Sequence, residues 1–380
     1  MRRAFYTAVV FLLSLFFLPG SSAAPLPKST QEILKKLKLD PNLLSDIDRE
    51  LQVPEDWVEK ARQEGRLQVV STFSPGEIKE FFAPFRERYP FISIEHSDAS
   101  REVRSVKTLT AYKSGKVITD VLFAIGGTFF HYKEADALED LRVIPAVKNA
   151  PLETRDKDGL WVGTDLIYWC MAYNTKLARK EDLPKKWEDL LGNPKWAGGN
   201  VALVNRPNLW VLQLWKAKGE KWTKDFLERL FAQVRPQLRK EGQGALLELL
   251  SAGEFQAVIP AREASTYQKV IQGAPLGFTC PEPVPASATE TGILKGAPNL
   301  HAARLFMQWL LSKEGQIAQY AASHHPPVHR GLQRTEFIPF AENILGKPVS
   351  YRDPGLETEV LPHLLDFWNN LWARGGKAKP

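Results

Sequence analysis

The sequence predicts an α/β protein built from two lobes, and two observations support this prediction. From Leu67 onward, short apolar runs alternate with amphipathic helical segments, which is typical of a mainly parallel sheet covered by helices. A second series of the same kind begins at Leu183, after an apolar stretch from Leu160 to Asn174. That stretch is too long for a typical single strand, so we expect it to cross from one lobe into the other.

Residues 1–24 predict a cleavable secretory signal. Arg2 and Arg3 precede an apolar run from Ala8 to Leu18 that is too short to span a bilayer. The small residues Ala23 and Ala24 follow, and we expect cleavage near them. An uncleaved membrane anchor is the alternative. The sequence therefore predicts an exported, periplasmic protein.

The composition is that of an ordinary soluble protein, with 44% hydrophobic and 25% charged residues among 380. This length suggests two domains or one large one. The formal net charge is +6, but acidic and basic residues are interspersed along the chain. Such a distribution argues against a nucleic-acid-binding stripe.

The first lobe is expected to follow a helical arm at residues 25–65. A strand over 67–72 leads into a helix that begins at Ser74, where Glu77 completes a Ser-x-x-Glu capping box. Pro84 is expected to kink or restart this helix. Strands over 91–96 and 120–124 complete the series.

The second lobe is expected to contain strands over 200–205, 255–260 and 276–280, with helical segments between them. We therefore assign residues 66–164 and 292–380 to the first lobe, with a helical tail at its end, and residues 165–291 to the second.

Ligands of parallel sheets gather at the carboxyl ends of the strands, where helix N-termini offer free N–H groups. The loops Ser71–Gly76, Ser97–Arg101 and Ile125–Thr128 are therefore expected to lie along one edge of the first lobe. The candidate ligand-binding residues at strand ends of both lobes are Thr72, Ser74, Ser100, Arg101, Gly127, Asn205, Arg206, Arg262 and Glu263.

Two of these candidates have competing interpretations. The Ser74 hydroxyl either caps its helix and does nothing more, or also binds an anion. Arg262 directly follows an apolar strand, so its guanidinium either faces an anion or forms a salt bridge with Glu263.

Cys170 and Cys280 are the two cysteines of the chain, and both lie in strand-like segments. Export permits a disulfide between them. Two buried free thiols are the alternative that the sequence leaves open.

Several segments, in this order along the chain, resemble the periplasmic solute-binding proteins of ABC transporters, in the branch named for ferric-ion binding. The segments that carry the resemblance are "EGRLQVVSTFS", "FRERYPFISIE", "AYKSGKVITDVLF", "DGLWVGT", "AYNTKL", "LPKKWEDLLGNPKWAG", "AGEFQAVI", "KGAPNLHAARLFMQWLLSKEGQ" and "PPVHR". The resemblance implies a type II periplasmic-binding fold, in which the chain crosses twice between two lobes and a solute binds in the cleft. It further implies a monomer without a cofactor that delivers its ligand to a membrane permease.

The chain departs from the iron-binding members at one position. Those members place adjacent tyrosines after the strand that corresponds to "GEFQAVIP", whereas Arg262, Glu263 and Ala264 follow that strand here. The nearest tyrosine is Tyr267. We therefore expect a small anionic solute, or a metal–anion complex held through Glu263 and Tyr267, rather than a free ferric ion.

A metal-dependent hydrolase is a competing hypothesis, because "SHHPPVHR" brings His324, His325 and His329 close together in sequence. A structural envelope protein is another. The chain lacks a Gly-x-Ser-x-Gly elbow, a His-Glu-x-x-His motif and a P-loop. We therefore expect a binding protein and not an enzyme.

Overall fold

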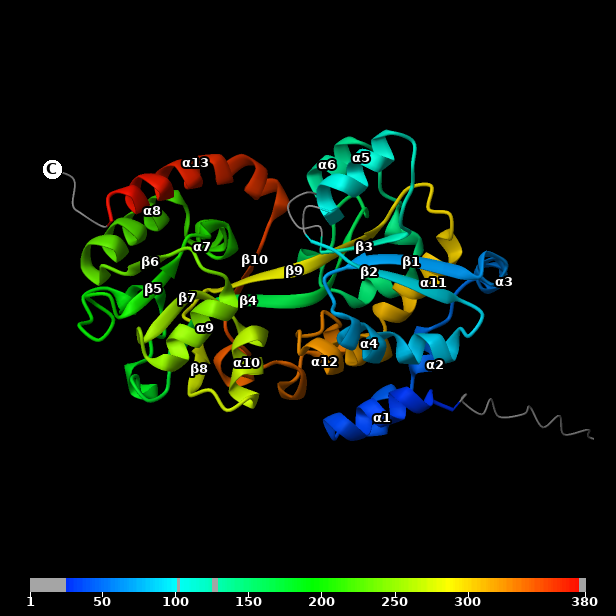
Figure 1. The fold of residues 1–380 in the computed structure, drawn as a ribbon, viewed down its shortest axis with the longest axis horizontal. Coiled ribbons are helices and arrows are strands. Elements are labelled where there is room, and N and C mark those ends of the chain that lie inside the picture. Colours follow the sequence, from blue (N-terminus) through cyan, green and yellow to red (C-terminus); the bar gives the residue numbers. More distant parts are fainter. Residues whose placement is uncertain (1–24, 101–102, 125–128, 376–380) are drawn as a thin grey trace, which may run out of the picture.

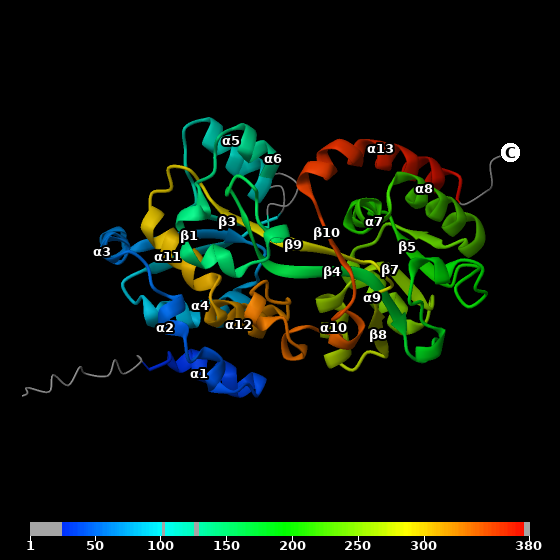
Figure 2. The ribbon, with the colours of Figure 1, turned by 180° about the vertical axis from the view of Figure 1, so that it is seen from behind.

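The computed structural model describes residues 25–100, 103–124 and 129–375. Figure 1 shows two α/β lobes side by side, and Figure 2 shows the same arrangement from behind. The helices are α1 (Lys28–Leu37), α2 (Ile47–Glu50), α3 (Glu55–Glu64), α4 (Pro75–Arg88), α5 (Thr108–Lys113), α6 (Phe129–Glu134), α7 (Val211–Lys218), α8 (Glu220–Arg229), α9 (Gln243–Ala252), α10 (Glu263–Ile271), α11 (Leu300–Leu310), α12 (Lys313–Ser323) and α13 (Pro354–Ala373).

One continuous set of strands runs through both lobes in the order β2-β1-β3-β9-β4-β7-β5-β6, with β10 paired to β9 and β8 paired to β4. The strands are β1 (Arg66–Ser71), β2 (Ser93–Asp98), β3 (Val121–Phe123), β4 (Val162–Asn174), β5 (Val201–Val204), β6 (Gln237–Arg239), β7 (Ala257–Arg262), β8 (Leu276–Thr279), β9 (Val284–Ile293) and β10 (Val349–Tyr351). The predicted α/β class with largely parallel pairing inside each lobe is confirmed.

The predicted crossing between lobes is strand β4, and β9 crosses back beside it in the antiparallel direction. Strand β3 is antiparallel to β9, with Phe123 opposite Thr291, and β7 is antiparallel to β4, with Arg262 opposite Trp169. The carboxyl ends of β3 and β7 therefore point toward each other. The central parts of β4 and β9 lie between these ends, and the β4–β9 register shifts there between Gly163 and Leu166.

The first lobe is organised around helix α4. The predicted capping box is present, because the Ser74 hydroxyl accepts from the Glu77 N–H and the Glu77 carboxylate accepts from the Ser74 N–H. The helix continues through Pro84 as one element. Its apolar face buries aromatic rings against α11, including Phe85, whose ring centre lies 5.3 Å from that of Phe306. Burying one such ring stabilises the fold by roughly 1.5–3 kcal/mol.

The helices at the start of the described chain are joined to the first lobe by a buried carboxylate. Glu314, on α12, accepts hydrogen bonds from the Thr30 hydroxyl of α1, the Trp309 indole of α11 and the Arg88 guanidinium of α4. A buried charge is tolerated when it is paired and hydrogen-bonded in this way. The predicted signal and its cleavage site lie outside the described residues. Within the described ranges, no helix has both the length and the apolar character needed to span a bilayer.

The C-terminal helix lies in a different lobe from the one we predicted. Residues 292–380 were expected to belong to the first lobe, but α13 packs on α7 and on residues 207–209 of the second (Figure 1). Its Trp368 is fully buried and donates its indole N–H to the Asn205 side chain. The cause is strand β10, which pairs with the second-lobe end of β9 and so directs the following helix to that side.

Cys170 and Cys280 form a disulfide that joins β4 to the residue after β8. Both cysteines are completely buried. The bridge closes a loop with a sequence separation of 110 residues inside the second lobe.

We expect reduction of this disulfide to lower the free energy of unfolding by up to about 4–5 kcal/mol, because the reduced unfolded chain regains the entropy of a long open loop. Urea unfolding of the protein with and without a phosphine reductant measures the difference. A thiol titration that finds both cysteines free in the denatured, unreduced protein would contradict the bridge.

Candidate functional site

The structure describes seven of the nine predicted ligand-binding residues; Arg101 and Gly127 lie outside the described residues. Thr72, Ser74 and Ser100 are exposed after the ends of β1 and β2. Arg206 is exposed after β5. The Asn205 side chain accepts the hydrogen bond from Trp368, so it fastens α13 to the second lobe.

A polar cluster occupies the centre of the crossing strands around Asp165, a residue that sequence analysis did not single out. Asp165 lies within the register shift of β4 and is 1% exposed. Its carboxylate accepts hydrogen bonds from the Thr289 hydroxyl of β9 (2.6 Å) and from the Gln319 amide of α12 (2.8 Å). A strand irregularity of this kind changes the direction in which a side chain points, and such irregularities are common beside functional sites.

His325 joins this cluster from the loop after α12. Its Nδ1 lies 3.1 Å from Asp165 Oδ2. Burial would raise the pKa of Asp165, but the charge of His325, its hydrogen bond and the charge of Arg262 together lower that pKa. Burial and the positive charge of Arg262 lower the pKa of His325. Asp165 therefore stays ionised at neutral pH.

The two lobes meet at His325. The ring centre of Phe73, which follows β1 in the first lobe, lies 6.3 Å from that of His325. Arg262, at the end of β7 in the second lobe, is close enough to lower the pKa of His325, and Glu77 of α4 acts on that pKa in the opposite direction. Residues from two facing strand ends therefore surround one half-buried histidine.

Arg262 and Glu263 carry polar atoms that lack protein partners. Arg262 Nε and Glu263 Oε1 are buried, and neither has a hydrogen bond among the described residues. Native proteins leave few such atoms, so each one calls for an explanation such as a ligand or a bound water. The ion pairs of the described chain do not include one between Arg262 and Glu263, so the predicted salt bridge is not formed.

The Glu263 carboxyl group has an unusual protonation equilibrium. Its Oε2 accepts a hydrogen bond from the backbone N–H of Tyr168 at 2.7 Å, and its side chain is fully buried. Burial raises its pKa to about 7, although the charge of Arg262 and the hydrogen bond from Tyr168 oppose this rise. Near neutral pH, Glu263 therefore exchanges between a charged acceptor and a neutral donor.

The hypothesis of a histidine metal site is wrong. His325 contacts Asp165, His329 Nδ1 accepts from the Gly331 N–H, and the His324 ring lies against Tyr320. The three side chains therefore have different partners. In the part of the chain that the structure covers, no three His, Cys, Asp or Glu side chains are arranged to hold a metal ion.

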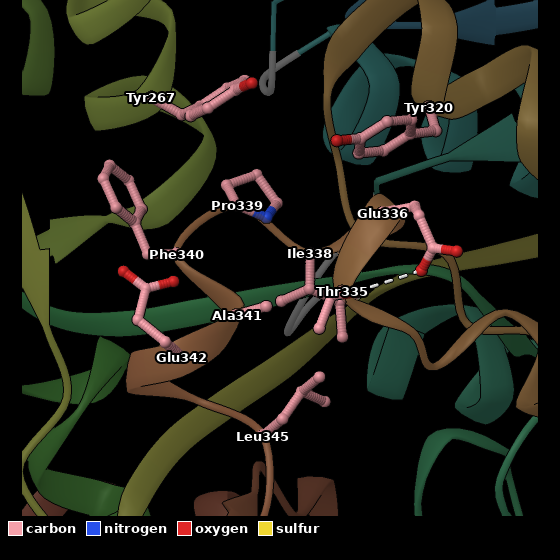
Figure 3. Close-up of a pocket in the computed structure, with 10 residues that line it drawn as sticks. All are labelled: Tyr267, Tyr320, Thr335, Glu336, Ile338, Pro339, Phe340, Ala341, Glu342 and Leu345. Atoms are coloured by element: carbon pink, nitrogen blue, oxygen red, sulfur yellow. Dashed lines mark hydrogen bonds between the residues drawn. The ribbon is translucent and has the colours of Figure 1, made fainter. Parts of the chain in front are cut away.

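Tyr267 lies one helical turn after Glu263 but faces a different space. It lines a cavity between α10 and α12 together with Tyr320 and Phe340 (Figure 3). Glu263 instead contacts the backbone of β4 and is not part of that cavity wall. The structure therefore does not bring Glu263 and Tyr267 together as the predicted ligands of one metal–anion complex.

Residues 80–344 match the family described as bacterial extracellular solute-binding protein. The chain belongs to this family. Among curated proteins, it is similar to an uncharacterized protein of Haemophilus influenzae, with 34% identity over 154 residues, which are 37% of this chain and 41% of that protein. The chain thus spans less than half of that relative.

Two other similarities extend over more of the chain. The chain is 22% identical to the iron uptake protein A2 of Synechocystis over 253 residues, covering 62% of this chain and 72% of that protein. A Trichodesmium structure in complex with iron and citrate superposes with a TM-score of 0.67 at 17% identity, covering 81% of this chain and 99% of that one. At this identity the likeness shows the fold, which is the type II periplasmic-binding fold.

We expect ionisation of Glu263 to destabilise the folded protein as the pH rises. The folded state holds this proton more tightly than the unfolded state does, so stability falls between about pH 4.5 and about pH 7. The rise of the pKa from 4.5 to about 7 corresponds to about 3 kcal/mol. Glu263→Gln should remove this loss, and therefore should gain stability over the natural protein at pH 8 but not at pH 4.

Urea unfolding at both pH values tests this expectation. Glu254→Gln, which changes an exposed carboxylate of the same lobe, is the matched control and should follow the natural protein. Parallel pH profiles for the natural protein and Glu263→Gln would show that Glu263 titrates normally.

Proposed function

We propose that this protein is the exported solute receptor of an ABC importer, and that it binds a small anionic solute between its lobes and delivers it to a membrane permease. Membership of the extracellular solute-binding family supports the receptor role. The observation that carries the choice of an anion is Arg262, whose buried Nε–H has no acceptor among the described residues.

The surroundings of Arg262 favour a charged oxygen ligand. A guanidinium presents several N–H groups in a fixed plane that matches a carboxylate or phosphate. Asp165 is the neighbouring carboxylate, but its oxygens are already used by Thr289, Gln319 and His325. Arg262 therefore keeps hydrogen-bonding capacity for an incoming anion.

The first lobe offers a second contact at the N-terminus of α4. This helix end carries a partial positive charge, and Ser74 is exposed there beside the buried Phe73. An anion held by Arg262 in one lobe and by the α4 N-terminus in the other would favour lobe closure. Hinge closure around a ligand is a general property of two-lobed binding proteins.

A metal–anion complex is the second candidate ligand. One relative is named an iron uptake protein, and one structure of the same fold contains iron and citrate. Glu263 Oε1 is a buried carboxylate oxygen without a partner, and it is the kind of donor that a hard cation prefers. In this version, the anion itself supplies the remaining oxygen ligands of the metal.

We expect Arg262→Ala to weaken solute binding about tenfold to hundredfold, because a hydrogen bond to a charged group contributes about 1.5–3 kcal/mol. Native mass spectrometry of the purified protein identifies the solute that co-purifies with it. Calorimetry with that solute then compares the natural protein, Arg262→Ala and Arg262→Lys, which keeps the charge and loses the planar fork. Melting curves without solute confirm that each variant is folded.

Arg179→Ala is the matched control, because Arg179 is an exposed second-lobe arginine paired with Glu181. It should bind the solute normally. A neutral or cationic solute, or unchanged affinity in Arg262→Ala, would contradict the proposal. A solute that binds tightly only together with ferric ion would favour the metal–anion version.

A further inference from the structure

The cavity lined by Tyr267 lies between α10 of the second lobe and α12 of the first, closed on one side by residues 335–345 (Figure 3). Its volume is about 400 Å³. Neither Arg262 nor any other residue of the polar cluster at the crossing strands lines it. The cavity is therefore separate from the proposed anion site.

Aromatic rings form much of the wall of this cavity. The Tyr267 ring meets the Phe340 ring edge-on, with centres 5.9 Å apart and planes at 89°. Figure 3 shows the hydroxyl groups of Tyr267 and Tyr320 directed toward each other. The His324 ring contacts both tyrosines, with its centre 5.5 Å from that of Tyr267 and 5.7 Å from that of Tyr320. Burial and the neighbouring Tyr267 raise the pKa of Tyr320 to about 12, so its phenol remains neutral at physiological pH.

Two carboxylates also line the cavity, and they differ in their partners. Glu336 forms an ion pair with Arg334 at 2.5 Å and accepts a hydrogen bond from the Thr335 hydroxyl. Glu342 accepts one hydrogen bond from the Asn343 amide, and the described residues supply it with no ion-pair partner. Figure 3 shows its carboxylate beside the Phe340 ring. Glu342 is therefore a negative charge that is not neutralised, placed against an aromatic wall.

The backbone holds Phe340 in a costly conformation. Its φ is +57°, in the left-handed region that bulky side chains rarely occupy. The ring is stacked on Phe278, with centres 5.3 Å apart, and this contact fixes its position in the wall. Strain of this kind persists where the surrounding structure determines it, and it is concentrated at functional sites.

We propose that this cavity binds a small organic cation, of the quaternary ammonium or alkylamine class. Such cations are attracted to the faces of aromatic rings and to a nearby carboxylate. Tyr267, Tyr320 and Phe340 supply the rings, and Glu342 supplies the charge. Tyr267 belongs to the second lobe and Tyr320 to the first, so the bound cation contacts both lobes.

The probe is choline, compared with its uncharged carbon isostere 3,3-dimethylbutan-1-ol, and binding is measured by calorimetry on the full chain. We expect saturable binding of choline and at least about tenfold weaker binding of the isostere, which has the same shape without the charge. Glu342→Gln should weaken choline binding about fivefold. Glu254→Gln is the matched control and should leave it unchanged, since Glu254 is an exposed carboxylate that does not line the cavity.

Variants at Tyr267 separate ring recognition from coordination by the phenol oxygen. Tyr267→Phe should bind choline normally because the ring face remains, whereas Tyr267→Leu should bind it several-fold more weakly. Equal binding of choline and its isostere, or no binding of either, would overturn the proposal. So would loss of binding in Tyr267→Phe, which would point to a metal ion held by phenolate. Choline binding must also survive Arg262→Ala, because its loss there would place the cation in the anion site.

Discussion

The antiparallel pairing of β4 with β9 is the constraint on which the rest of the structure depends. Both strands run through both lobes. Strands β3 and β10 pair with β9, strands β7 and β8 pair with β4, and the other strands extend the sheet from β3 and β7. Since β3 runs antiparallel to β9 and β7 runs antiparallel to β4, their carboxyl ends must face each other. Parallel sheets bind ligands at those ends, so the location of the polar cluster follows from hydrogen-bond register alone.

Within this frame, the buried Asp165 determines how the cluster is charged. An unpaired buried carboxylate would cost several kcal/mol, but Asp165 has donors from β9, α12 and the His325 loop. Those donors hold the crossing strands against α12. Because they also occupy the oxygens of Asp165, they leave Arg262 next to a negative charge without a hydrogen bond to it. The same contacts thus stabilise the hinge and leave an arginine available to a ligand.

Sequence patterns predicted the features that depend on local interactions and failed where distant segments meet. The capping box of Ser74 and Glu77 and the strand before Arg262 can be recognised within a few residues. Asp165 gave no such signal, because its partner His325 lies 160 positions away. The C-terminal helix was placed in the wrong lobe because its position depends on the short pairing of β10 with β9. The three histidines are close in sequence, but in the folded chain their rings contact different partners.

The contrast between Glu263 and Glu342 indicates that position, more than residue type, sets the charge that a site offers to a ligand. Both are glutamates, yet burial makes Glu263 a partly protonated group beside an arginine, whereas Glu342 is exposed and has no cationic partner in the described structure. Near neutral pH the first site therefore holds Arg262 beside an ionised Asp165 and a partly ionised Glu263, whereas the second carries a negative charge against aromatic rings. Both sites take side chains from the two lobes. The geometry of both sites therefore depends on how the two lobes are placed relative to each other.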